Sequence, residues 1–297
     1  MVSKDSLLRR MRLWAKSFKG SWSIYCTNKL ALIGLGILLV FTALALFPQY
    51  FSPYDITKRG TLEDRMKPPS LKHLLGTDDM GKDILSLIIH GTRISMLIGF
   101  VSAVISVGIG SIVGLVSGYY GGMKGGLMMR ATDVFSVMPT IPLMITLAAL
   151  LRPSIWNIIL VIGVTSWTGV ARIVRSEVLS RKERLFVQRA RSLGCSDRRI
   201  LGKYILQGIL PLILANTILR VVSGITSEAL LGFLGLGDPT VVSWGTLLHF
   251  SFLTGAFSMG AYWYFIPPGI AIVLSILGFI MVSQGLDAII NPRLRRI

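Results

Sequence analysis

Residues 76–83, GTDDMGKD, nearly match the phosphate-binding pattern G-x-x-x-x-G-K-[ST], in which backbone amides and a lysine hold the phosphates of a nucleotide. Asp83 stands where a serine or threonine hydroxyl would bind magnesium, and Asp78 and Asp79 would place negative charge against the phosphates. We therefore interpret this segment as a turn whose aspartates cap the start of a helix. The sequence then has no ATP-binding motif of its own, and we expect the chain not to be an enzyme.

Arg220 and Glu228 are ionisable residues inside or near the end of a long apolar segment, 208–231. Charged groups are costly within a membrane and usually face a bundle interior or an aqueous cavity. A separation of eight residues places the two on roughly one helix face, too far apart for an easy direct ion pair. Two interpretations stay open: a buried structural network with partners on other helices, or a place for Arg220 along a substrate pathway.

The remaining reactive side chains are scattered. His73, His90 and His249 have no acidic or cysteine neighbours at metal-ligand spacing, and no Ser/His/Asp set can be placed together. Cys26 and Cys195 both fall in segments that we assign to the reducing cytoplasm, so we expect no disulfide. We predict no catalytic residues, no metal site and no cofactor held by this chain.

The composition indicates an integral membrane protein. The chain of 297 residues is 52% hydrophobic and 15% charged, with a mean hydropathy of +0.66, whereas soluble domains carry about 25% charged residues. Its net charge of +17 does not require nucleic acid as a partner, because basic residues collect in the cytoplasmic loops of membrane proteins. We expect membrane lipid, and no nucleic acid, around this chain.

Six segments are apolar enough to cross a bilayer, which takes about 20 residues. They are 30–50, 94–119, 134–151, 155–174, 208–231 and 262–286. Pro139 and Pro142 lie in the third, where neighbouring helices can satisfy the freed carbonyls. The predicted fold class is therefore an all-α, polytopic membrane protein with six transmembrane helices.

The basic residues set the predicted orientation. The segments 1–29, 121–130, 172–203 and 291–297 hold 22 of the 31 Lys and Arg residues, and the intervening loops hold 8. This asymmetry places both termini in the cytoplasm of a multi-pass cell-membrane protein. It also gives a cytoplasmic N-terminal segment 1–29, a first transmembrane helix 30–50, an extracellular loop with an interfacial helix at 51–93, a core at 94–290 and a cytoplasmic tail 291–297.

Two patterns within these elements carry structural information. Gly110, Gly114 and Gly118 recur every fourth residue, which lets another helix approach closely, either as fixed packing or as a sliding contact. The loop 172–203 has ten basic residues, and its helix-forming halves are separated by Gly194. Such a loop could be only a topology signal or bind anionic lipid, but a helix–glycine–helix element between spans suits a knob that sits in the groove of a cytosolic partner.

The sequence of this loop resembles that of a known family. Residues 188–197, QRARSLGCSD, resemble the cytoplasmic EAA loop of permease subunits of bacterial and archaeal ABC importers. The segments GTDDMGKDILSLIIHGTRIS (76–95), EALLGFLGLG (228–237), SWG (243–245) and NPRL (291–294) extend the resemblance over most of the chain. They resemble the dipeptide/oligopeptide/nickel group, and within it the second, "C-type" permease of each pair.

The resemblance implies a type I ABC importer (MetI-like) transmembrane domain with a coupling loop at 175–207. The residues that it implies for docking an ATPase subunit are Gln188, Arg189, Ala190, Leu193, Gly194, Cys195, Ser196 and Asp197. It also implies a second homologous permease, two ATP-binding subunits that hold ATP and magnesium, and an extracellular substrate-binding protein. Dipeptides and oligopeptides are the expected cargo, ahead of oligosaccharides and nickel.

Other function classes fit the sequence less well. An ion-coupled secondary transporter would usually carry several intramembrane carboxylates and inverted repeats, whereas here Glu228 is the main such group. The chain also departs from the family pattern: Gln188 replaces an acidic residue, Arg189 a small one, and Gln207 a proline, although Pro211 follows. Arg220 stands where relatives have a small or apolar residue, which makes it a candidate for a difference in substrate.

Overall fold

The computed structural model describes residues 25–58 and 60–290, and these form helices joined by loops. In chain order the helices are α2 (Lys29–Leu46), α3 (Pro48–Phe51), η1 (Leu62–Asp64), α4 (Ile84–Tyr120), α5 (Gly122–Val137), α6 (Thr140–Leu150), α7 (Ile155–Thr165), α8 (Thr168–Lys182), α9 (Leu185–Ser192), α10 (Asp197–Arg199), η2 (Ile200–Leu206), α11 (Gln207–Phe233), α12 (Trp244–Leu253) and α13 (Tyr262–Ile290). Extended pairing within the described residues is limited to one isolated bridge, between Thr77 and Asp83. Most of the predicted segment 1–29, and the tail 291–297, lie outside the described residues.

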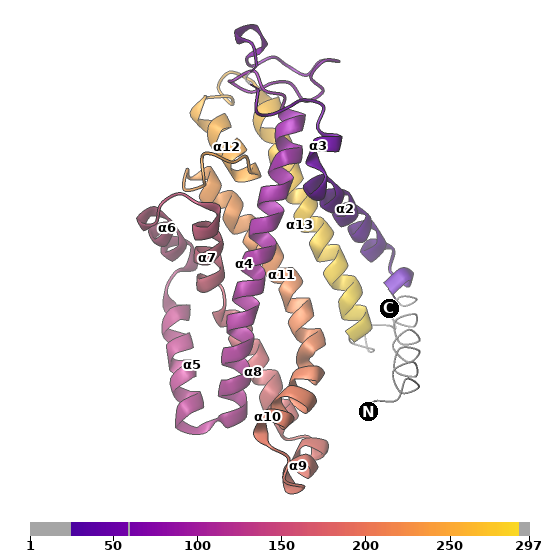
Figure 1. The fold of residues 1–297 in the computed structure, drawn as a ribbon, viewed down its shortest axis with the longest axis vertical. Coiled ribbons are helices and arrows are strands. Elements are labelled where there is room, and N and C mark those ends of the chain that lie inside the picture. The colour runs from indigo at the N-terminus through magenta and orange to yellow at the C-terminus, as the bar shows by residue number, and fades with distance from the viewer. Residues whose placement is uncertain (1–24, 59, 291–297) are drawn as a thin grey trace, which may run out of the picture.

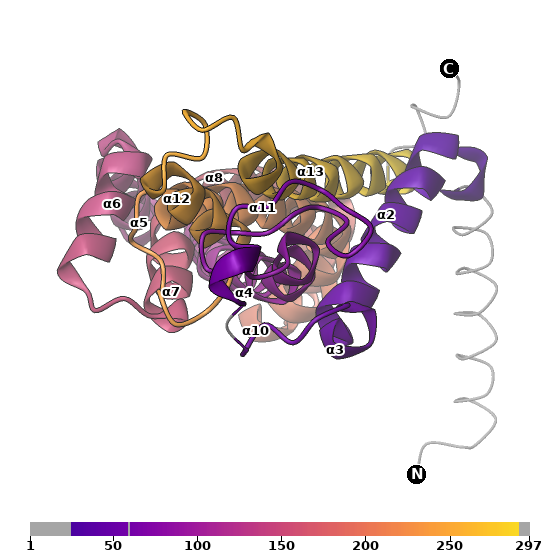
Figure 2. The same ribbon diagram turned by 90° about the horizontal axis from the view of Figure 1, so that it is seen from above.

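Helix α4 is the central column of the bundle. It runs the length of the molecule, with α2 and α13 on one side and α5, α6 and α7 on the other (Figures 1 and 2). Within the part of the chain that the structure describes, four helical stretches are long and apolar enough to cross a membrane, and the count rises to six if each of two bent helix pairs is one span. The predicted all-α, polytopic fold class is confirmed, whereas the orientation of the termini stays a prediction.

The two bent pairs correspond to the predicted third and fourth spans. Helices α5 and α6 meet at 85°, and α7 and α8 meet at 42°. Met138 precedes Pro139 and is extended, with ψ 127°, because a residue before proline is driven out of the helical region. The segment 134–151 is therefore not one continuous helix, and residues 122–130 of the predicted loop belong to α5 instead.

The start of α4 lies at Ile84, further toward the N-terminus than the predicted span beginning at residue 94. The Asp83 carboxylate accepts a hydrogen bond from the Ser86 backbone N–H at 2.9 Å, which satisfies one of the free amides of the first turn. This cap confirms the interpretation of residues 76–83 as a turn that opens a helix. Gly121, with φ +61°, ends α4 and separates it from α5.

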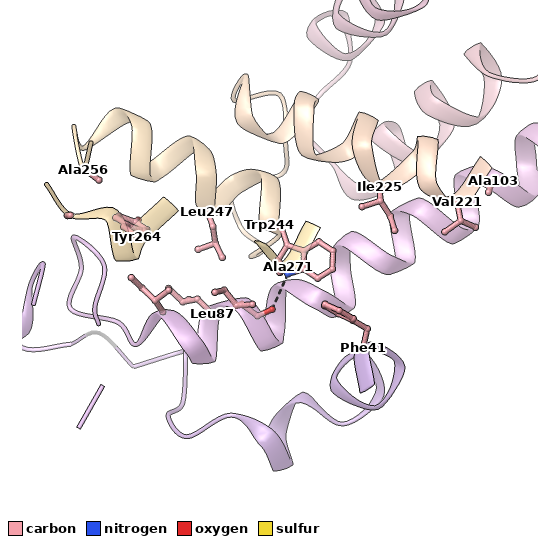
Figure 3. Packing of buried hydrophobic residues seen from close by; sticks show 13 residues of the cluster. Phe41, Leu87, Ala103, Val221, Ile225, Trp244, Leu247, Ala256, Tyr264 and Ala271 are labelled. Carbon is pink, nitrogen blue, oxygen red and sulfur yellow. Dashed lines mark hydrogen bonds between the residues drawn. The ribbon is translucent and has the colours of Figure 1, made fainter. Parts of the chain in front are cut away.

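The core near this end is built around Trp244 of α12, which is fully buried. Its ring stands edge-on to Phe41 at 5.6 Å between centroids, and its indole N–H donates to the Ile88 carbonyl at 3.3 Å. Figure 3 shows Trp244 between Phe41 and Leu247, so side chains of α2, α4 and α12 meet there. A second cluster of buried aliphatic residues joins α4, α8, α9, η2 and α11 at the opposite end.

Candidate functional site

Helix α9 carries three of the eight predicted coupling residues, the other five follow it directly, and it projects at the end of the bundle opposite to the loop before α4 (Figure 1). It ends in a left-handed turn at Gly194, with φ +76°. The Gly194 N–H donates to the Arg191 carbonyl at 3.0 Å, and the Cys195 N–H donates to the Ala190 carbonyl at 3.1 Å. These two bonds form a Schellman motif, which explains why a glycine is needed between α9 and α10.

The inner face of α9 is packed into the bundle. Val187 and Ala190 are buried, and Val187 belongs to the same cluster as Val178 of α8 and Ile200 of η2. Each buried aliphatic side chain stabilises its position by about 1.5–3 kcal/mol relative to exposure. The loop between α8 and α11 is therefore a packed body and not a flexible connection.

Tyr119, near the end of α4, anchors this body and was missed by sequence reasoning. The buried Tyr119 hydroxyl donates a short hydrogen bond to the Asp197 carboxylate. The Lys182 ammonium and the Arg191 guanidinium lie 5.9 Å and 5.6 Å from the centroid of its ring, within the range of cation–π attraction. One aromatic side chain thus ties α4 to the segments containing α8, α9 and α10.

The outer face of α9 combines exposed apolar and basic side chains. Leu185 and Leu193 are 70% and 83% exposed, and Phe186 is 47% exposed. Arg189 and Gln188 are also exposed, and the Gln188 amide donates to the Glu183 carbonyl at 3.3 Å. This surface, which we call the coupling face (Leu185, Phe186, Gln188, Arg189 and Leu193), leaves apolar area uncovered on a rigid element, as docking surfaces do.

The structure separates the eight predicted coupling residues by exposure. Ala190 is buried, Cys195 is half-buried, and Gln188, Arg189, Leu193, Gly194, Ser196 and Asp197 are exposed. Ala190 packs the inner face of α9 into the bundle. Asp197 accepts the hydrogen bond from Tyr119 and so fixes the start of α10 to α4. Their part in docking stays a prediction.

The glycine stripe of α4 faces α8. A Cβ atom added at Gly110, Gly114 or Gly118 would lie within 2.7–2.9 Å of Cβ atoms on α8, whose residues there are Val170, Val174 and Val178. The stripe contributes no side chains of its own, so the valine side chains and backbone carbonyls of α8 pack directly against the backbone of α4. This contact joins the end of α8 that precedes α9 to α4, the central column.

Glu228 is buried between helices. Its carboxylate accepts a hydrogen bond from the Ser95 hydroxyl of α4 at 2.9 Å, and the Ser95 oxygen accepts one from the Trp244 backbone N–H at 3.1 Å. The carboxylate thus takes part in a network that joins α11, α4 and the start of α12. Glu228 therefore has hydrogen-bond partners on other helices, whereas the role of Arg220 stays a prediction.

Arg220 is placed differently. Its side chain is half-buried, and it makes no ion pair with a carboxylate of the described residues. One guanidinium nitrogen, Nη2, faces Gly169 near the start of α8, at 2.8 Å from where a Cβ of that residue would stand. The structure does not bring Arg220 and Glu228 together.

Two family models match this chain. The first, binding-protein-dependent transport system inner membrane component, matches residues 110–296, and the second, N-terminal TM domain of oligopeptide transport permease C, matches residues 17–69. The chain belongs to the family of binding-protein-dependent inner membrane transport components. This confirms the resemblance to ABC-importer permeases, so the chain is a multi-pass membrane permease subunit.

Curated relatives align with nearly the whole length of the permease. It is 36% identical to the oligopeptide transport system permease protein OppC of Bacillus subtilis (strain 168), over 99% of this chain and 93% of the relative. It is 34% identical to the dipeptide transport system permease protein DppC of the same strain, over 93% and 86%. It is 32% identical to the glutathione transport system permease protein GsiD of Escherichia coli O6:K15:H31 (strain 536 / UPEC), over 92% and 90%.

A solved structure shares the fold. The permease matches a chain of inward-facing conformations of the MetNI methionine ABC transporter with a TM-score of 0.56, covering 72% of this chain and 98% of that chain. The sequences are 17% identical, so the likeness concerns the fold alone. It confirms the predicted type I, MetI-like architecture.

Proposed function

We propose that the permease forms the translocation pathway of a peptide importer together with a second, homologous permease. Two ATP-binding subunits dock on the coupling faces of the pair, and an extracellular binding protein delivers the cargo. Short peptides are the proposed cargo, because the relatives named above are permeases for oligopeptides, dipeptides and glutathione. ATP and magnesium are bound by the partner subunits.

The observation that carries this proposal is the coupling face on a packed support. Leu193 offers apolar area to a partner, while Val187 and the Tyr119–Asp197 bond fix α9 to the bundle. A partner that displaces α9 therefore displaces α4 and α8 with it. In this way nucleotide-driven movement of an ATPase subunit changes access to the pathway, as a two-state element biased by its ligand.

The test replaces Leu193 by aspartate in the assembled complex. The side chain is 83% exposed, so the permease should fold normally, but a charge should enter the contact with the ATPase subunit. An apolar hot-spot residue is worth about 2 kcal/mol or more, which corresponds to about 30-fold weaker retention of the ATPase. Retention is measured by co-purification, and peptide uptake by vesicles containing the complex.

Leu71→Asp is the matched control. Leu71 is fully exposed and lies in the loop before α4, at the opposite end of the molecule. This variant should keep the ATPase subunits at the wild-type ratio. Wild-type retention and uptake in the Leu193→Asp complex would contradict the docking role, and a wild-type complex that takes up no peptide would contradict the cargo.

A further inference from the structure

Helix α11 carries a polar stripe in a stretch that is otherwise apolar enough to cross a membrane. Asn216, Arg220, Ser223 and Ser227 follow one another at intervals of four, three and four residues, so they share one face over three turns. Ser223 is exposed and the other three are half-buried. A stripe of this kind lines an aqueous route more readily than a lipid contact, because polar groups are costly in hydrocarbon.

The charge on this stripe is not balanced within the described residues. An arginine at the centre of a transmembrane helix costs about 2.5–3.5 kcal/mol by insertion scales, so it requires water or an anion. Two carboxylates of the bundle are engaged with other groups: Glu228 accepts from Ser95 at 2.9 Å, and Asp133 of α5 pairs with Arg172 at 2.8 Å. Arg220 therefore has its charge available for a group that is not part of these helices.

The surroundings of Arg220 fix where its guanidinium lies. Gly169 has no side chain, and Nη2 of Arg220 occupies the space beside it, at 2.8 Å from where a Cβ would stand. One turn away on the stripe, the Asn216 amide N–H donates to the Leu212 carbonyl at 3.0 Å, which leaves its side-chain oxygen as an acceptor. A guanidinium donor fork beside an amide acceptor matches a carboxylate next to a peptide N–H.

We propose that Arg220 binds the C-terminal carboxylate of a peptide in transit. The inference rests on the proposed function, because it takes the cargo to be a peptide and α11 to line its route. It goes further in assigning one residue of the permease to one chemical group of the cargo. The rival occupant of this site is a carboxylate of the second permease, but a single ion pair between subunits does not call for flanking polar residues over three turns.

The experiment compares two cargoes in one reconstituted complex. Uptake of a tripeptide with a free C-terminus and of its C-terminal amide is measured for the wild type, Arg220→Gln and Arg220→Lys. The same binding protein serves every variant, so the change in the acid-to-amide uptake ratio reports the permease alone. A charge-assisted hydrogen bond is worth about 1.5–3 kcal/mol, so Arg220→Gln should lower this ratio about tenfold or more.

The outcomes separate the inference from the function on which it rests. Arg220→Lys should keep part of the preference, because it retains the charge but loses the planar fork. An unchanged acid-to-amide ratio in Arg220→Gln would overturn the inference while leaving peptide import intact. Loss of the second permease on purification of Arg220→Gln would also overturn it, by assigning the arginine to the interface. Failure of the wild type to import either peptide would refute the proposed function itself.

Discussion

Replacing Gly114 by alanine should destabilise the permease, whereas the same replacement at Gly108 should not. Both glycines lie inside α4, but a Cβ at Gly114 would lie 2.7 Å from the Ala171 carbonyl oxygen and 2.7 Å from the Val174 Cβ, whereas Gly108 has nothing within 4 Å. An ordinary contact begins at 3.4 Å, so α8 would have to move away by 0.7 Å. Gly110 and Gly118 make the same close contact with α8 on either side of Gly114. Moving α8 away from Gly114 would therefore also separate the helices at Gly110 and Gly118.

Two effects on the free energy of unfolding decide the comparison of the variants: a gain in helix propensity that both share, and a packing cost that only one of them carries. Alanine gains about 0.5–1 kcal/mol over glycine within a helix, and this gain is common to both positions. Overpacking a well-packed contact costs about 1–3 kcal/mol, and this cost applies only at Gly114. The difference between the variants therefore isolates the packing of α4 against α8.

The measurement is thermal unfolding of the purified complex in lipid nanodiscs. At about 2–4 °C per kcal/mol, the cost of about 1–3 kcal/mol means that Gly114→Ala should melt about 2–12 °C below Gly108→Ala. Gly108→Ala should match or slightly exceed the wild type. Equal melting temperatures for the two variants would refute the reasoning, because the close approach of α8 would then carry no energy.

Three further predictions concern groups outside this contact. Burial raises the pKa of Asp78 from 3.8 to about 6, so the folded loop favours the protonated carboxyl more than the unfolded chain does. The free energy of unfolding should therefore fall as pH rises from about 4 to 6. In melting curves from about pH 4 to 8, Asp78→Asn should flatten this dependence. Tyr119→Phe removes the bond to the Asp197 carboxylate, worth about 1.5–3 kcal/mol, and should speed hydrogen exchange of α9 amides about tenfold or more, with no change expected in α2. Glu228→Ala leaves the buried Ser95 hydroxyl without its acceptor and should cost about 1–3 kcal/mol in unfolding experiments, whereas Glu228→Gln keeps an acceptor oxygen and should cost less.

Those features of the fold that depend on local chemistry could be predicted from the sequence. The long apolar runs gave the spans, and Asp83 was recognisable as a helix cap because a carboxylate before an apolar run satisfies free amides. The spacing of the glycines on α4 indicated a close helix contact, and the structure places α8 there. The helix boundaries were less predictable. Hydropathy indicates which residues can lie in the hydrocarbon of a membrane, whereas a helix begins and ends where its backbone hydrogen bonds do.

Other features depend on partners distant in the sequence. The 85° break at Met138–Pro139 could not be told from a tolerated kink, since prolines within membrane helices are often compensated by neighbours. Tyr119 gave no signal as an anchor, because its acceptor, Asp197, follows 78 residues later. The only local hint was an aromatic residue at the end of a span beside a glycine stripe.

The helices differ in how they can transmit movement from the coupling face. Helix α4 is continuous over 37 residues, about 55 Å at 1.5 Å per residue, and it joins the capped loop at Asp83 to the anchor at Tyr119. Helix α8 is packed against it along the glycine stripe, so in the proposed mechanism a displacement of α9 moves both helices together. The breaks at Met138–Pro139 and Ser166–Trp167 lie beside this rigid pair, where a change of backbone angle costs fewer helical hydrogen bonds than elsewhere. In the proposed mechanism we expect a movement that begins at the coupling face to change the backbone at these two breaks, and the second of them lies close to Gly169, the residue that Arg220 faces from α11.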